Sequence, residues 1–177
     1  MSQRITSHGI HQLGFTLIEV LVAMLVLLVG LLGVLGMQLD SFQNSRSALY
    51  KNQATIIAED FVDRVRGNAA GLAAGHYNSV AFTAASSMPT AVACVAEGGC
   101  SAVQQAGYDQ YQWARNFVPS HPNYTPALPA AQGQAAVDSL DAGGVCGASI
   151  KYDVVVEWQA VAGDSDGQVR VSACLAN

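Results

Sequence analysis

The chain has 177 residues, of which 51% are hydrophobic and 12% are charged, and its formal net charge is −5. This composition is too apolar for an intrinsically disordered protein, and the length suits one ordinary domain. The 8 lysine and arginine residues are scattered along the sequence. No surface is therefore expected to neutralise phosphates, which argues against nucleic acid as a partner.

A long apolar run lies near the amino terminus. The 18 residues 20–37 carry no charge and are nearly all apolar, and Phe15 to Ile18 extend the run backwards. Such a segment forms a helix about 27 Å long, enough to cross a bilayer. A cleaved secretory signal fits less well, because the run is too long and no small-residue cleavage site follows it. Gly30, Gly33 and Gly36 either permit close helix contact or soften the helix.

Glu19 stands at the start of this apolar run. An ionised carboxylate deep in a bilayer costs about 3 kcal/mol on insertion scales, so it normally has a partner or stays hydrated at the interface. A plain membrane anchor explains every feature of the segment except this residue. The residues from Gly14 to Glu19 read GFTLIE, and this motif, followed directly by a spanning run, resembles the processing site of type IV prepilins and type II secretion pseudopilins.

The resemblance implies cleavage after Gly14 by a prepilin peptidase on the cytoplasmic side and N-methylation of Phe15. Glycine leaves room for the peptidase to approach the backbone. In this family the glutamate meets the terminal amine of a neighbouring subunit, so Glu19 is expected to set the register of assembly. Pairing of Glu19 with its own amine, one helical turn away, stays open. Arg4 and the free amine favour a cytoplasmic amino terminus.

The helix is expected to continue beyond Met37 to about Gly67. Gaps that are multiples of three or four predict one helical stripe, and no proline interrupts it. The stripe comprises Leu39, Phe42, Tyr50, Ala54, Ile57, Phe61 and Val65.

The next part of the chain has weaker signals. Residues 68–93 are rich in alanine, glycine, serine and threonine and predict a connecting loop with one short element. Ser101 can cap a helix, in which Trp113 and Phe117 are expected to pack in the core. Four prolines between residues 119 and 129 mark an irregular segment, which residues 131–148 are expected to continue.

The carboxyl-terminal part predicts a β-hairpin. Apolar residues alternate from Ile150 to Trp158, which is typical of a strand. Residues 163–167 predict a turn, and residues 168–175 a returning antiparallel strand.

Four cysteines, Cys94, Cys100, Cys146 and Cys174, lie far from the apolar run. An even count favours disulfides in an oxidising compartment over zinc, which normally brings paired C-x2-C spacings. The hairpin brings Cys146 and Cys174 together, and two glycines between Cys94 and Cys100 permit a tight turn. We predict these two pairs, although four cysteines allow three connectivities.

These segments together predict an α+β, pilin-like fold, in which a long amino-terminal helix packs on a small antiparallel sheet. The expected divisions are a leader peptide at residues 1–14, a transmembrane or filament-core helix at 15–38, its amphipathic continuation at 39–67, and a periplasmic globular domain at 68–177.

Further motifs resemble the PilV-like minor pilins, also called type IV pilus modification proteins. They are VLVAM after Glu19, VGLLG at residues 29–33, the run from Cys94 to Trp113, and VVVEW at 154–158. The resemblance implies a non-enzymatic minor pilin that takes part in assembly initiation, piliation, twitching motility and adhesion. A minor pseudopilin of a type II secretion system and a tip adhesin pilin are the alternatives.

The same resemblance implies partners and location. The partners are other minor and major pilins, the prepilin peptidase, and the inner-membrane assembly platform. The chain is expected to cross the inner membrane once, with its carboxyl-terminal domain in the periplasm, and to enter the pilus on assembly. The sequence contains no catalytic motif, and no metal or cofactor is expected.

Overall fold

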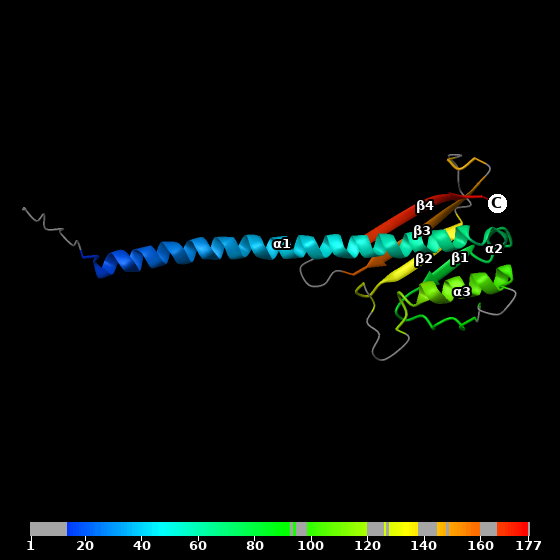
Figure 1. Cartoon of the computed structure of the whole chain (residues 1–177), viewed down its shortest axis with the longest axis horizontal. Coiled ribbons are helices and arrows are strands. Elements are labelled where there is room, and N and C mark those ends of the chain that lie inside the picture. Colours follow the sequence, from blue (N-terminus) through cyan, green and yellow to red (C-terminus); the bar gives the residue numbers. More distant parts are fainter. Residues whose placement is uncertain are drawn as a thin grey trace, which may run out of the picture. The chain divides into compact units, whose positions relative to one another are not determined.

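The computed structural model describes residues 14–92, 94, 99–119, 126, 128–137, 145–147, 149–159 and 166–176. It divides into two compact units, Met1–Phe42 and Gln43–Asn177. The helices and strands follow one another as α1 (Leu17–Arg66), α2 (Ala69–Ala73), β1 (Ser79–Phe82), α3 (Ala102–Ala114), β2 (Gln132–Val137), β3 (Ile150–Trp158) and β4 (Gly167–Leu175). Figure 1 shows their arrangement.

Helix α1 confirms the long amino-terminal helix. It runs without interruption for 50 residues, and Glu19 lies in its first turn while Arg64 and Arg66 lie in its last. Both placements are favourable for the helix dipole. Gly67 and Asn68 follow the last turn, as the sequence indicated.

Within the second unit, α1 contributes one buried stripe to the core. Ala54, Ala58, Phe61 and Val65 are fully buried, at the spacing of four, three and four residues that keeps side chains on one helix face. The amino-terminal part of the predicted stripe was wrong: Leu39 and Phe42 belong to the first unit, and their side chains are 64% and 72% exposed.

The four strands form one antiparallel sheet in the order β1-β2-β3-β4, so every strand pairs with its neighbour in sequence. The predicted hairpin is confirmed as β3 and β4. The prediction of irregular structure for residues 131–148 was wrong, because β2 occupies 132–137. Residues 68–93 likewise hold two short elements, α2 and β1. The predicted turn at 163–167 lies mostly outside the described residues.

Strand β2 shows why the pattern was missed. Its sequence, QGQAAV, contains no aromatic residue and only one β-branched residue, so its intrinsic strand propensity is low. Pairing on both sides holds it in place. Gly133 is needed there, because a Cβ atom at this position would collide with the rings of Phe117 and Trp113.

One face of the sheet carries the core. Val80, Ala135 and Val154 are buried and lie opposite one another across β1, β2 and β3. The helices α1 and α3 pack on this face through aromatic rings. Phe61 of α1 stacks on Trp113 of α3 with ring centroids 4.2 Å apart, and the indole of Trp113 donates a hydrogen bond to the Ile57 carbonyl at 3.2 Å.

Helix α3 begins where the sequence predicted. The Ser101 hydroxyl accepts a hydrogen bond from the Gln104 backbone N–H, and the Gln104 side chain accepts one from the Ser101 N–H. This capping box satisfies two backbone donors at the start of the helix. Trp113 and Phe117 are fully buried, as expected.

The β3–β4 hairpin is fastened near both ends. At one end Cys146 and Cys174 form a disulfide. At the other end Gly167 lies opposite Trp158 in the register, and a Cβ atom on Gly167 would fall inside the indole ring of Trp158. Only glycine can occupy this position while the indole keeps its place.

Candidate processing and assembly segment

The segment from Gly14 to Glu19 is exposed. Nothing approaches within 4 Å of a Cβ atom built on Gly14, and the Phe15 side chain is 81% exposed. Helix α1 begins at Leu17, and the Thr16 carbonyl accepts hydrogen bonds from the N–H groups of Glu19 and Val20 at 3.1 and 3.4 Å. The predicted cleavage site therefore lies before the helix, in exposed backbone outside any helix or strand.

Glu19 has a free carboxylate in this part of the structure. Its side chain is exposed and makes no hydrogen bond or ion pair with any described residue. The position at the amino end of α1 stabilises its negative charge through the helix dipole. Within one chain, the carboxylate is thus available to an external cation.

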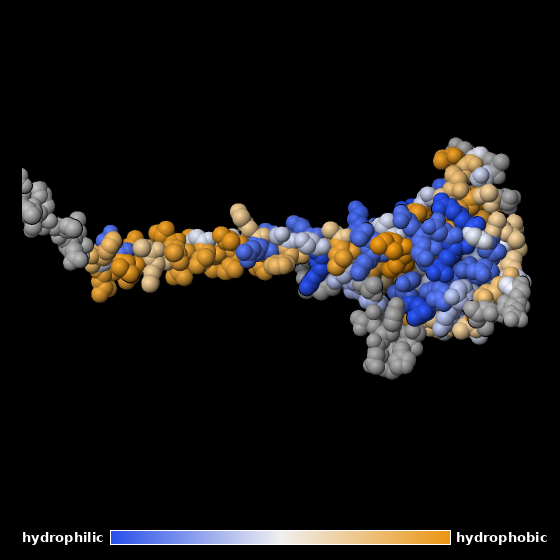
Figure 2. Space-filling model, viewed as in Figure 1, coloured by the Kyte–Doolittle hydropathy of each residue, from blue (hydrophilic) through white to orange (hydrophobic). Residues whose placement is uncertain are grey.

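Around and beyond Glu19, the first unit presents apolar side chains on every side of α1. Within the described part of the chain, α1 is the one helix long and apolar enough to cross a membrane, and none of its most apolar window is buried. Figure 2 shows hydrophobic residues along this part of the helix. Gly30, Gly33 and Gly36 have no neighbour near their Cβ positions. A segment this apolar requires lipid or other protein around it.

The second unit contains both predicted disulfides, Cys94–Cys100 and Cys146–Cys174. No cysteine is free, so the thiolates that a zinc site would need are absent from these four positions. Among the described residues, no group of three His, Cys, Asp or Glu side chains could hold a metal ion.

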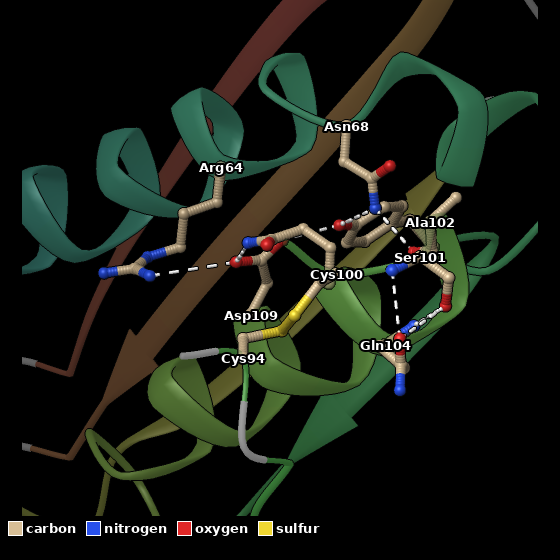
Figure 3. Close-up of a disulfide and its surroundings, with 10 residues drawn as sticks. Arg64, Asn68, Cys94, Cys100, Ser101, Ala102, Gln104 and Asp109 are labelled. Atoms are coloured by element: carbon tan, nitrogen blue, oxygen red, sulfur yellow. Dashed lines mark hydrogen bonds and ion pairs between the residues drawn. A yellow bond between two sulfur atoms is a disulfide. The ribbon is translucent and has the colours of Figure 1, made fainter. Parts of the chain in front are cut away.

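A buried polar cluster that sequence reasoning missed lies beside the first disulfide (Figure 3). The Tyr77 hydroxyl donates to Asp109 Oδ2 at 2.6 Å and accepts from Asn68 Nδ2 at 2.9 Å. Asn68 also donates to the Ala102 carbonyl at 2.8 Å. Gln105 donates to Asp109 Oδ1 at 2.9 Å. The cluster therefore connects the segment after α1 to the first two turns of α3, because Asn68 contacts Ala102 and Tyr77 contacts Asp109.

Burial sets the electrostatics of this cluster. Asp109 is 1% exposed, and loss of solvation raises the pKa of its carboxyl, although the hydrogen bonds from Tyr77 and Gln105 and the charge of Arg64 oppose that rise. Burial and the nearby Asp109 raise the pKa of the Tyr77 hydroxyl. Both groups are shielded from solvent and already paired with each other, so the arrangement suits structural support rather than chemistry on a substrate.

One signal in the sequence could have revealed the cluster. Asp109 is the one charged residue on the buried face of α3, where it lies between Ala106 and Trp113 at helical spacing. A lone acid at such a position needs a buried partner. Two of its partners, Tyr77 and Arg64, lie 32 and 45 residues upstream, and nothing in the sequence identifies them.

Two family models match the chain. The prokaryotic N-terminal methylation motif matches residues 10–35, and the model described as type IV pilin Tt1218 matches residues 36–111. No curated protein and no solved structure matches. The two matches adjoin, and together they cover the candidate processing segment, α1, α2, β1 and most of α3. Strands β2 to β4 lie beyond them.

A long amino-terminal helix followed by a small antiparallel sheet is a pilin-like architecture. With the two family matches, it makes this chain a type IV pilin with a prepilin-type N-terminal motif. The family is one of structural subunits. The motif implies processing by a prepilin peptidase and assembly into pili with other pilins, and it fits membrane anchoring before assembly.

Proposed function

We propose that this chain is a minor pilin of the PilV-like kind, a non-enzymatic subunit that acts in the assembly or initiation of a type IV pilus. One observation carries the proposal. The apolar stretch of α1 at residues 17–37 is exposed and follows directly on an accessible Gly14–Phe15 bond, and its single charge is Glu19, which has no partner among the described residues. The motifs shared with PilV-like proteins support a minor rather than a major role.

In this proposal residues 1–14 are a leader that the peptidase removes, and Phe15 becomes the N-methylated amino terminus. Residues 15–38 anchor the chain in the inner membrane and later enter the filament core. Residues 39–67 continue that helix into the globular part, and residues 68–177 lie in the periplasm. The disulfides suit that compartment, because it is oxidising.

Glu19 is proposed to pair with the methylated amine of an adjacent pilin. A carboxylate in an apolar environment is costly unless it is paired. A neighbouring subunit whose amine lies level with Glu19 along the filament axis is therefore favoured over one that is displaced along this axis.

The first experiment is mass spectrometry of the protein from its native membrane, with fragmentation of the amino-terminal peptide. The proposal requires a chain that begins at N-methylated Phe15. A chain that still begins at Met1, in cells with an active prepilin peptidase, would refute it.

A second experiment separates the proposed role from a secretion pseudopilin. The protein is quantified in sheared surface pili relative to the major pilin, in cells that carry the native chain or Glu19→Ala. A minor pilin is expected in pili at low copy, and the variant should insert and be cleaved normally but enter pili poorly. Absence of the native chain from pili, with loss of protein secretion on its deletion, would favour the pseudopilin.

A further inference from the structure

Strand β4 forms an open edge of the sheet. It pairs with β3 through nine consecutive residue pairs, from Gly167 opposite Trp158 to Leu175 opposite Ile150, with no bulge. Among the described residues, no strand lies on the other side of β4, and no loop donates a backbone hydrogen bond to it. Figure 1 shows β4 at the sheet margin opposite β1.

The usual protections of an edge strand are missing here. Natural edges are shortened, bulged, interrupted by proline, or lined with charges. Strand β4 is nine residues long, contains no proline and carries one charge, Arg170. The Arg170 guanidinium is held over the outer face of the sheet by Asp153, at 3.3 Å. Every second backbone N–H and C=O of β4 therefore points outward without a strand to receive it.

A hollow lies between this edge and the last turns of α1. Its lining residues are Glu59, Val62, Asp63, Arg66, Val171, Ser172 and Ala173. Val62 and Ala173 are buried and Val171 is partly buried, which gives the hollow an apolar floor. The exposed acids stand on the α1 side of the hollow.

The charge on that side is not balanced. Asp63 pairs with Arg66 at 2.7 Å, whereas the exposed Glu59 makes no ion pair or hydrogen bond with any described residue. A ligand that follows β4 through the hollow would thus pass a negative charge.

We propose that the β4 edge binds an extended peptide segment of a partner protein as a fifth strand of the sheet. The unpaired backbone groups recognise extended backbone. The apolar floor takes alternate small aliphatic side chains of the segment, and Glu59 takes a lysine or arginine. This inference goes beyond the proposed function and does not depend on it, because it rests on the second unit alone.

The test uses the full chain in detergent micelles. The probe is a peptide as long as the nine residues of β4, in which valine alternates with threonine and lysine. Hydrogen exchange of single amides is followed at millimolar excess of this peptide. Exchange at every second amide of β4 should slow by about tenfold, while the amides of β3 and α3 stay unchanged. The same peptide with N-methyl groups on alternate nitrogens should give no protection.

Two variants test whether the negative charge of Glu59 contributes to peptide binding. Glu59→Lys should weaken binding of the lysine-containing peptide about three- to tenfold. Asp40→Lys, a matched reversal at an exposed acid of α1 in the first unit, should leave binding unchanged. Equal weakening by both variants would overturn the role of Glu59.

Other outcomes would overturn the proposal itself. An unmethylated peptide without effect means that the edge does not accept a strand. Equal protection by the methylated peptide means that side chains alone are bound. Protection that grows with protein concentration, with no peptide present, means that β4 of a second copy is the occupant.

Discussion

The buried hydroxyl of Tyr77 gives a quantitative prediction. Tyr77→Phe removes a hydrogen bond to the Asp109 carboxylate and leaves one N–H of Asn68 without a partner. A hydrogen bond to a charged group contributes about 1.5–3 kcal/mol, and an orphaned buried donor costs about 1 kcal/mol more. The free energy of unfolding of the second unit should therefore fall by about 3 kcal/mol.

The measurement is urea unfolding of the full chain in detergent micelles at neutral pH, followed by tryptophan fluorescence. Trp113 reports on this region because it packs on Phe61 and Phe117. The matched control is Tyr152→Phe, whose hydroxyl donates to one neutral acceptor, the Tyr77 carbonyl, at 3.0 Å. The free energy of unfolding of that variant should fall by about 1 kcal/mol. If Tyr77→Phe costs no more than the control, the charged cluster does not stabilise the fold as argued.

Two further predictions concern the same unit. Because burial raises the pKa of Asp109 above its ordinary value of 3.8, the folded state binds this proton more tightly than the unfolded state, and the resulting stability is present at low pH and lost as pH rises through the folded pKa. In urea unfolding measured from acid to neutral pH, Asp109→Asn should remove this decline in the free energy of unfolding. Parallel plots of the free energy of unfolding against pH for the native chain and the variant would contradict the prediction. Replacing both cysteines of the Cys146–Cys174 disulfide, whose members are 28 residues apart, should cost about 3.6 kcal/mol on the loop-entropy scale. The same change to Cys94–Cys100, 6 residues apart, should cost about 2.2 kcal/mol, so a reversed order in denaturant midpoints would show that chain entropy does not govern the two bonds.

Local signals in the sequence were sufficient for much of this fold. The apolar run and the stripe after it predicted α1, because both depend on periodicity within one helix. Ser101 and Gln104 stand three residues apart and cap α3 with each other. The alternation from Ile150 to Trp158 predicted β3, because one face of that strand is buried and the other is half-exposed.

The features that were missed depend on distant partners. Strand β2 forms because β1 and β3 lie on both sides of it and because Gly133 leaves room for two aromatic rings. The contacts among Asn68, Tyr77 and Asp109 join three separate segments. The processing segment was read from its motif, but the roles of Gly14 and Glu19 require a peptidase and a second subunit. Both roles stay predictions.

The glycine opposite Trp158 has a consequence for how the hairpin can fail. A slip of two residues keeps the alternation of faces, whereas a slip of one residue would reverse it. In β4 such a slip would bring Val169 to the place of Gly167, where the indole leaves no room for any side chain. At the far end Cys174 is covalently bound to Cys146. The register of β4 is thus fixed. The outward-pointing N–H and C=O groups of this open edge therefore keep fixed positions.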